Sequence, residues 1–227
     1  MFLGGYHSEM TGTKGEWLAD YCRRTGRAYL RLDYSGHGLS GGDFADGTIG
    51  GWCRDALTVM ERRVSGPCIL VGSSMGGWIM LLVARELGDR VRGMVGIAAA
   101  PDFTRDLMWN AFDSSTRQRL ETEGIVYLES DYDDTKIPVR REFIEDGNRH
   151  LLLDAPIPIR CPVHLLHGRK DPDVPWQTAE RLMEGLESEA VTVSYFKDGD
   201  HRLSEPRYLE FLGRALDAMV DGCVNGG

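Results

Sequence analysis

A glycine- and serine-containing segment in the first third of the chain has the residue types and spacing of a catalytic nucleophile. The motif G-S-S-M-G at residues 72–76 follows a short apolar run and precedes a helix-forming run that ends near Leu87. This order predicts a buried strand that turns sharply into a helix and exposes one hydroxyl at the bend. Glycine is needed on both sides because a Cβ atom would collide where strand and helix pass closely. Ser74 is therefore the predicted nucleophile and Ser73 is structural; the alternative is a glycine-rich turn with a chance serine.

A serine nucleophile needs a base within hydrogen-bond distance and an acid that orients this base. His201 lies in a polar loop after the last predicted strand, and ligands of open parallel sheets bind beyond the carboxyl ends of strands. Asp171 follows the predicted strand that ends at Gly168, so its carboxylate can reach the same edge. We therefore predict a catalytic triad of Ser74, Asp171 and His201.

Other residues could fill these roles. His167 is the main rival base because it also closes a strand, and Asp173 is the fallback acid in the loop that carries Asp171. Asp200 is a weaker candidate, since the sequence neighbour of a histidine rarely faces its Nδ1. His201 itself could be a solvated loop histidine.

The tetrahedral intermediate of acyl transfer needs two backbone N–H groups aimed at its developing negative charge. Met75, the residue after the nucleophile, is expected to supply one. Tyr6, in the glycine-containing loop after the first predicted strand, is the best candidate for the other. His7 and Ser8 could line the pocket mouth. The alternative is a plain turn with solvated side chains.

The elements that must position these residues alternate between strand and helix, which predicts an α/β protein with a mostly parallel sheet flanked by helices. Apolar runs without strict alternation, such as residues 92–100, are typical of strands covered on both faces. The predicted strands are residues 1–3, 28–33, 68–71, 92–100, 162–168 and 190–196, and the helices outside the insertion include residues 13–25, 49–64, 177–186 and 204–220. The shortness of the first strand suggests that residues upstream are missing or that the first strands of a larger sheet are absent.

The alternation breaks down over residues 102–154, which we interpret as a small helical lid inserted into a single domain of residues 1–227. Two helices are predicted there, at residues 105–123 and 140–148, with a polar stretch at residues 129–134 between them. Met108, Trp109 and Phe112 could line an acyl pocket. Packing of the lid against the core is the commoner role for residues at such helical spacing.

Composition excludes several classes of function. Of the 227 residues, 42% are hydrophobic and 27% charged, as in an ordinary globular protein. The formal net charge of −9 argues against nucleic-acid binding and against anionic membranes. No segment has the roughly 20 apolar residues that a membrane span requires, and no signal peptide is visible. The five scattered cysteines form neither a disulfide framework nor a zinc site and indicate a reducing compartment.

A formal G-x-G-x-x-G motif at residues 36–41 does not indicate a nucleotide site. Such a site needs a helix that opens directly on the glycines, and here a loop follows them. No metal-ligand spacing is present either. We therefore expect no cofactor and no metal.

Taken together, five motifs in this order make the chain resemble the α/β-hydrolase superfamily over nearly its whole length. They are G-G-Y at residues 4–6, D-Y-S-G-H-G-L-S at 33–40, G-S-S-M-G-G at 72–77, H-G-R-K-D-P-D-V-P at 167–175 and G-D-H-R at 199–202. Within the superfamily the longer strings at 32–36, 71–78 and 166–176 are similar to the mitochondrial abhydrolase-domain palmitoyl-protein thioesterases, which also cleave acyl-glucuronides, and to their bacterial relatives. Gly4 departs from this pattern, because such enzymes usually carry His or Pro there.

The resemblance implies hydrolysis of an ester or thioester by a serine triad, on a small acyl substrate or on an acylated protein. Because bacterial relatives would be cytoplasmic and no presequence is visible, we expect a cytoplasmic location. One alternative is hydrolysis of a carbon–carbon or amide bond by the same triad, and another is a non-catalytic binding protein on the same scaffold. The acyl-chain length and the leaving group are left open.

Overall fold

A parallel β-sheet forms the centre of the molecule. The computed structural model describes residues 1–129 and 135–225, and its main sheet has five parallel strands in the order β1-β2-β3-β6-β7. These strands are β1 (Phe2–Leu3), β2 (Cys68–Ser73), β3 (Val91–Ile97), β6 (Val163–Gly168) and β7 (Val191–Phe196). Because all five run in the same direction, the loops after their carboxyl ends meet at one edge of the sheet.

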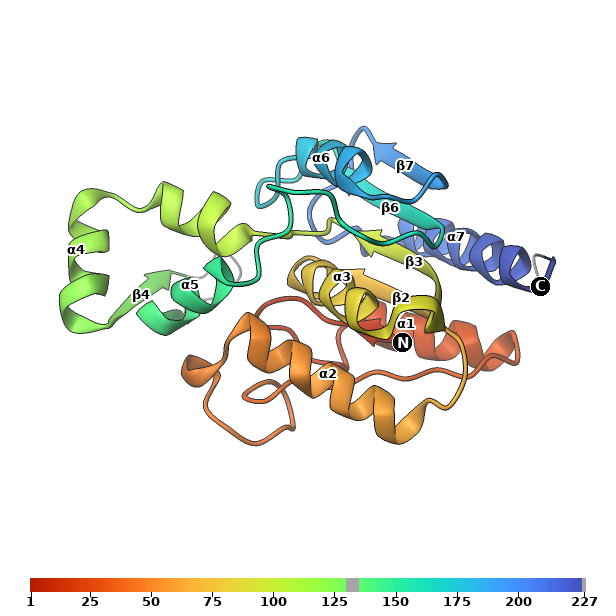
Figure 1. The fold of residues 1–227 in the computed structure, drawn as a ribbon, viewed down its shortest axis with the longest axis horizontal. Helices are drawn as coiled ribbons and strands as arrows, with labels where there is room; N and C mark the ends of the chain where they lie inside the picture. The colour runs from red at the N-terminus through yellow and green to blue at the C-terminus, as the bar shows by residue number, and fades with distance from the viewer. Residues whose placement is uncertain (130–134, 226–227) are drawn as a thin grey trace.

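Helices cover both faces of this sheet (Figure 1). Neighbouring residues of a strand point to opposite faces. Accordingly, Leu70 and Met94 pack into one buried cluster and Val71 and Val95 into the other, which explains apolar runs without alternation. One face carries α1 (Thr13–Arg24) and α7 (Pro206–Asn225), and the other carries α2 (Ile49–Arg63), α3 (Met75–Leu87) and α6 (Gln177–Gly185).

The strand predicted at residues 28–33 is wrong as a regular element. The structure has only an isolated parallel bridge there, between Phe2 and Arg31. The partner strand β1 has just two residues, so it offers little backbone to pair with. The carboxylate of Asp33 then accepts hydrogen bonds from the backbone N–H groups of Met10 and Leu39, which fixes two loops instead of extending a ladder.

The glycine loop at residues 36–41 leads into a single 3₁₀ turn, η1 (Phe44–Asp46), and α2 begins only after Thr48. A Cβ atom on Gly36 would lie 2.7 Å from the backbone of Phe44, so the loop folds back on itself. No helix N-terminus opens on these glycines, as the sequence predicted.

Between β3 and β6 the chain leaves the sheet and forms the insertion, which projects beyond one end of the sheet (Figure 1). A π-helical turn and a 3₁₀ turn come first, followed by a helix, an antiparallel hairpin and a second helix. In order these are η3 (Thr104–Met108), η4 (Trp109–Ala111), α4 (Ser114–Glu123), β4 (Ile125–Glu129), β5 (Lys136–Arg140) and α5 (Arg141–Asn148).

The helix predicted at residues 105–123 is therefore three shorter pieces. Asp113 divides it, because its carboxylate accepts the Thr116 N–H at 2.7 Å and caps a new helix. The helix predicted at 140–148 is present as α5, whereas the hairpin was not predicted. The polar stretch expected at residues 129–134 lies, apart from Glu129, outside the described residues.

The two ends of the insertion are joined at its root. Asp102 is fully buried with a φ of 59°, and its carboxylate accepts the N–H groups of Leu152 and Leu153 at 2.9 Å each. Arg105 adds ion pairs to Asp102 and, farther from the core, to Asp154. These contacts hold the first and last residues of the segment 102–154 together. Within residues 1–129 and 135–225, no helix is long and apolar enough to cross a membrane.

Candidate active site

The predicted nucleophile lies at a strained bend between β2 and α3. Ser74 has φ 54° and ψ −121°, a backbone conformation that residues other than glycine rarely adopt. Its backbone is held on both sides, because the Ser74 N–H donates to the Ile97 carbonyl at 2.9 Å and the Ala100 N–H donates to the Ser74 carbonyl at 3.0 Å. A Cβ on Gly72 would lie 2.4 Å from the Gly76 carbonyl oxygen, which is the close approach of strand and helix that the sequence motif predicted. A Cβ on Gly76 would lie 2.1 Å from the Leu3 carbonyl oxygen, so α3 also passes close to β1.

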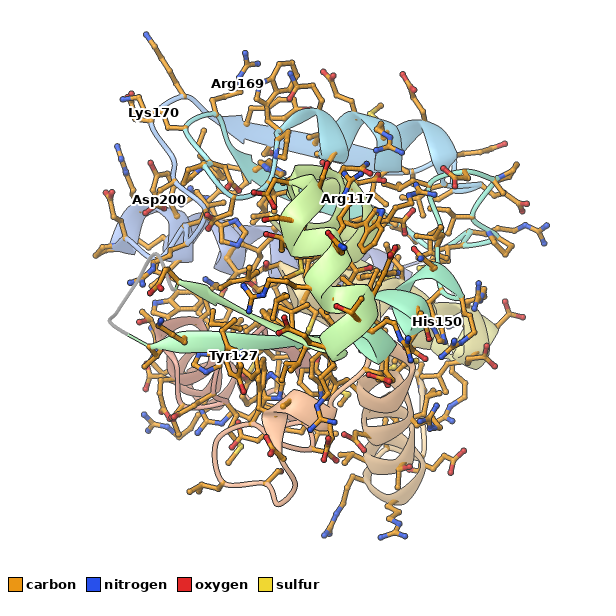
Figure 2. All side chains as sticks on the ribbon, turned by 90° about the vertical axis from the view of Figure 1, so that its left-hand side faces the viewer. Arg117, Tyr127, His150, Arg169, Lys170 and Asp200 are labelled. Atoms are coloured by element: carbon orange, nitrogen blue, oxygen red, sulfur yellow. The ribbon has the colours of Figure 1, made fainter. Side chains whose placement is uncertain are left out.

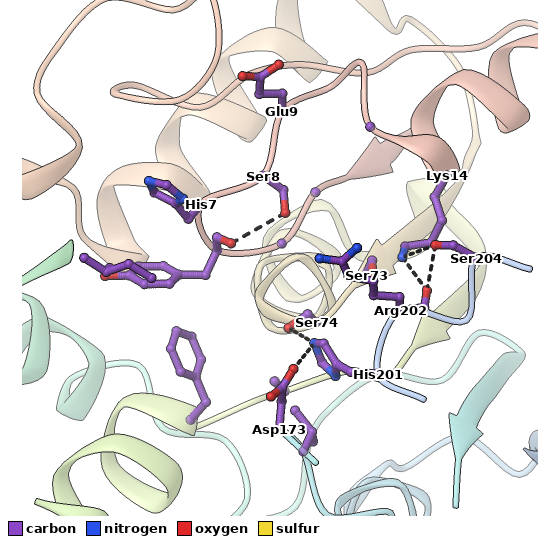
Figure 3. Close-up of a pocket in the computed structure, with 18 of the residues that line it drawn as sticks. His7, Ser8, Glu9, Lys14, Ser73, Ser74, Asp173, His201, Arg202 and Ser204 are labelled. Carbon is purple, nitrogen blue, oxygen red and sulfur yellow. Dashed lines mark hydrogen bonds and ion pairs between the residues drawn. The ribbon is translucent and has the colours of Figure 1, made fainter. Parts of the chain in front are cut away.

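The structure brings the three residues of the predicted triad into a hydrogen-bonded chain. Figure 3 shows its Ser74–His201 half, and the acid labelled there is the neighbouring Asp173. Ser74 Oγ lies 3.0 Å from His201 Nε2, and His201 Nδ1 lies 2.8 Å from Asp171 Oδ2. With Nδ1 protonated and bonded to the carboxylate, Nε2 is the free acceptor that faces the hydroxyl. This arrangement can take the proton from Ser74 as it attacks an electrophile.

The loops that carry Asp171 and His201 are fastened together at the ends of β6 and β7. The Lys170 N–H donates to the Gly199 carbonyl at 2.9 Å. A Cβ on Gly168 would lie 2.3 Å from that same carbonyl oxygen, so glycine is required for the two backbones to approach this closely. The register of the two strands therefore fixes the distance between the acid and the base.

The side chain of Asp171 is fully buried but is surrounded by donors. Its Oδ1 accepts the backbone N–H groups of Asp173 and Val174 at 2.9 and 2.8 Å, and Oδ2 faces both His201 and His167. Burial by itself raises the pKa of this carboxyl, but the hydrogen bonds from the two histidines and the backbone outweigh it and hold the pKa below its usual range. Asp171 is therefore an anion at neutral pH.

The rival residues from the sequence occupy other positions. His167 lies behind the acid, with Nε2 3.0 Å from the Val174 carbonyl and 3.3 Å from Asp171 Oδ2. Asp173 faces the other nitrogen of the His201 ring: its Oδ2 lies 3.9 Å from Nε2, whereas Asp171 is bonded to Nδ1. Asp200 accepts the Leu203 N–H and so shapes the loop that carries His201.

The two predicted oxyanion donors belong to segments next to the nucleophile. Met75 is the first residue of α3, directly after Ser74. Tyr6 follows Gly5 in the loop after β1, and a Cβ on Gly5 would lie 3.4 Å from Ser74 Cβ, which places this loop backbone against the elbow. Gly4, the departure from the family pattern, has no atom within 4 Å of its Cβ position and lines open space.

A cavity of about 750 Å³ opens over Ser74 and His201. Its lining includes His7 and Ser8 as predicted, whereas of the three predicted lid residues it includes Met108 but not Trp109 or Phe112. The apolar side chains that line it come mainly from the insertion and its root: Phe103, Leu107, Met108, Leu128 and Ile137. In Figure 2, which looks onto the insertion, Tyr127 of the hairpin is on the exposed outer side.

Several polar lining residues were not predicted from the sequence. Lys14, at the start of α1, donates to the Arg202 carbonyl at 2.6 Å and to Ser204 Oγ at 3.4 Å, so it ties α1 to the His201 loop (Figure 3). Burial lowers the pKa of Lys14 to about 8. The sequence offers no signal for this contact, because the two partners are 188 residues apart.

Among the described residues, Asp171, Asp173 and His201 offer ligand atoms within 4.8 Å of one another, the spacing of a possible metal site. Both oxygens of Asp171 already accept hydrogen bonds, and His201 Nδ1 is engaged by one of them. The grouping therefore reflects the hydrogen-bonded chain at Ser74.

Comparison with known proteins identifies the family. A model described as the alpha/beta hydrolase family matches residues 4–212. The mitochondrial palmitoyl-protein thioesterase ABHD10 of Mus musculus is 38% identical over 224 residues, covering 97% of this chain and 74% of that protein. A putative hydrolase from Agrobacterium vitis S4 has a TM-score of 0.93 at 43% identity, covering 96% of this chain and 86% of that one. Alpha/beta hydrolase domain-containing protein 10 from mouse has a TM-score of 0.90 at 38% identity, covering 98% and 89%.

The family resemblance and the fold predicted from the sequence are confirmed by these matches. The expected cytoplasmic location is wrong, because the curated relatives from five mammals are all named as mitochondrial proteins. That expectation rested on the likeness to bacterial relatives, and the scattered cysteines indicate a reducing environment without identifying a compartment.

Proposed function

The chain belongs to the α/β-hydrolase family, and on that premise we propose that it is a serine hydrolase of carboxylic esters or thioesters with Ser74 as its nucleophile. The observation that carries the proposal is the hydrogen-bonded chain from Ser74 through His201 to Asp171, at 3.0 and 2.8 Å. Named thioesterase relatives and the family match support the same class of reaction.

In the first half-reaction, Ser74 Oγ attacks the carbonyl carbon while His201 Nε2 accepts the hydroxyl proton. The carbonyl π electrons move to the oxygen, and the N–H groups of Tyr6 and Met75 stabilise this oxyanion. The intermediate collapses to the acyl-enzyme, and His201 gives its proton to the departing alcohol or thiol. Asp171 stabilises the transient imidazolium and keeps Nδ1 protonated.

In the second half-reaction, water attacks the acyl-enzyme carbonyl and His201 takes a proton from that water. Collapse of the second tetrahedral intermediate breaks the bond to Ser74 Oγ, which recovers the proton from His201. The products are a free acid and the original enzyme, so no cofactor enters the balance.

The lining of the cavity supports an apolar acyl group as the bound part of the substrate. Leu107, Met108, Leu128 and Ile137 approach the nucleophile from the insertion, so residues 102–154 act as a lid over the acyl chain. The polar part of the lining, at Lys14 and on the loop that carries His201, is where we place the leaving group. An S-acylated protein fits this division, and palmitoyl-protein thioesterase is the name of the curated relatives.

Replacement of Ser74 tests the proposal, with Ser73→Ala as the matched control because Ser73 also lines the cavity. Ser74→Ala should abolish both hydrolysis of p-nitrophenyl esters and labelling by a fluorophosphonate, and Ser73→Ala should retain both. Normal turnover in Ser74→Ala would overturn the assignment. A panel of acyl thioesters, p-nitrophenyl esters, acyl-glucuronides and amides of matched chain length then identifies the bond cleaved, and turnover of amides alone would contradict the proposed class.

A further inference from the structure

The ring of Tyr6 belongs to an aromatic cluster that includes part of the insertion. Tyr6 stacks on Phe143 of α5, with ring centroids 5.3 Å apart and an interplanar angle of 16°. It also meets Phe103, at the root of the insertion, at 5.8 Å. On the domain side it meets Phe44 at 4.9 Å and Trp52 at 5.9 Å. The Tyr6 ring is therefore clamped between the insertion and the domain.

The insertion makes a second contact with the same side chain. The Tyr6 hydroxyl donates to the carbonyl of Pro138 in β5 at 3.5 Å. Phe143 and Pro138 lie on consecutive elements of the insertion, so the hairpin and α5 approach Tyr6 together. Phe143 is itself 3% exposed and also contacts Trp52 and Phe103, which gives it little freedom to follow a displaced ring.

The backbone of Tyr6 needs such support. The following residue, His7, has a φ of 56°, so the loop turns through a conformation that costs roughly 1–3 kcal/mol and persists only when its surroundings fix it. His7 is exposed, with a ring contact to Phe44. The partly buried Tyr6 ring, with its contacts to four aromatic rings, is therefore the main anchor of the loop whose N–H is the proposed oxyanion donor.

A second path leads from the same cluster to the other proposed donor. Phe103 packs edge-on against Trp78 of α3 at 5.8 Å, and α3 is the helix that Met75 begins. Phe103 thus contacts both the residue that carries one donor and the helix that carries the other.

We propose that Phe143 is a positioning residue for the reaction: by stacking on Tyr6 it holds the oxyanion loop in place, so the insertion acts on the transition state as well as on the acyl chain. The inference rests on the proposed function, because an oxyanion donor has a role only in acyl transfer. A lid that merely covers the acyl chain would change the binding of long chains and leave the chemistry of short ones unaltered. The two roles therefore separate in kcat and KM.

The test compares Phe143→Leu with Trp109→Leu, using p-nitrophenyl acetate as a substrate whose acyl group is too short to depend on the lid. Trp109 is an aromatic residue of the same insertion whose ring contacts Phe112 and Arg117 and not Tyr6. Loss of one oxyanion donor lowers kcat by about 10²–10³-fold, so a displaced donor should lower it by roughly tenfold or more with KM little changed. Trp109→Leu should leave kcat for acetate unaltered.

A trifluoromethyl ketone, which forms a tetrahedral adduct with the serine, gives an independent readout. Its affinity should fall in Phe143→Leu in parallel with kcat, and Phe143→Tyr, which keeps the ring, should restore both. Phe143→Met, which keeps most of the volume without a planar ring, serves if the leucine variant does not fold. Unaltered kcat and ketone affinity in a folded Phe143 variant would overturn the inference. Failure of the proposed function has a different signature, because wild-type protein would then form no adduct at all.

Discussion

Replacement of Asp171 by asparagine is the perturbation whose outcome the geometry specifies most closely. The carboxylate accepts from four donors, two backbone N–H groups on Oδ1 and the rings of His201 and His167 on Oδ2. An amide has one oxygen and one NH₂, and the NH₂ cannot accept. In either orientation of the asparagine, its NH₂ group therefore faces two donors: the two backbone N–H groups in one orientation and the two histidine rings in the other. Each such mismatch in a buried site costs about 1–3 kcal/mol.

The kinetic effect is larger than the loss of stability. The orientation that keeps the oxygen on the backbone N–H groups turns the NH₂ toward His201 Nδ1, which then becomes the acceptor. The proton moves to Nε2, and the imidazole can no longer take the proton of Ser74. The same substitution in a serine protease triad lowers kcat by about 10⁴-fold. We therefore expect a loss of roughly 10³–10⁴-fold in Asp171→Asn.

Asp173→Asn is the matched control, because Asp173 lies in the same loop and was the alternative acid in the sequence. Its carboxylate is 3.9 Å from His201 Nε2, whereas Nδ1 is bonded to Asp171. We expect a change of less than about tenfold in kcat for a p-nitrophenyl ester, since it does not set the tautomer. Both variants should be assayed at saturating substrate, with folding checked by circular dichroism. The reasoning is refuted if Asp171→Asn keeps more than a tenth of the activity, or if Asp173→Asn loses as much.

Two further predictions concern stability. Gly76→Ala should destabilise the protein by about 3 kcal/mol or more in denaturant unfolding, because the new Cβ meets backbone oxygens of Leu3 and Gly4 at 2.1 and 2.4 Å. Gly4→Ala is the control and should be near neutral, because the space at its Cβ position is open. Equal effects of the two substitutions would contradict the conclusion that backbone crowding requires glycine at position 76. The lowered pKa of Asp171 means that its ionised form stabilises the fold above pH about 4, and this contribution is lost as pH falls through the lower folded pKa. The free energy of unfolding of wild type should therefore drop more steeply below pH about 4 than that of Asp171→Asn, and parallel curves would count against the ionised carboxylate.

The central sheet and the grouping of Ser74, Asp171 and His201 could be predicted because the sequence signals for them are local. Gly72 is needed where the strand and the helix of the bend meet, because its Cβ position lies 2.4 Å from the Gly76 carbonyl oxygen, and that contact is contained within five residues. The contact of Gly76 with Leu3 is not local, although the motif places a glycine there. Asp171 and His201 each follow a strand, so the parallel topology brings them to one edge without any knowledge of side-chain packing. His167 and Asp173 could not be ranked in the same way, because their roles depend on which ring nitrogen each one faces.

The insertion was harder to predict for a physical reason. The hairpin of β4 and β5 is stabilised by cross-strand pairing such as Val126 with Val139, and neither strand shows a strong pattern by itself. The helix predicted at residues 105–123 reads continuously in the sequence, yet capping by Asp113 divides it. The cluster around Tyr6 draws on segments as far apart as residues 6 and 143, and no local pattern contains that contact.

The measurement that tests the central claim most directly is the location of the acyl group during turnover. Wild-type protein mixed with p-nitrophenyl acetate, quenched in acid within the first turnover and digested, should yield one acetylated peptide, with the modification on Ser74 and absent from Ser73. His201→Ala should form this adduct far more slowly. Turnover without an acyl-enzyme, or a turnover-competent acetyl group on any other residue, would contradict the account.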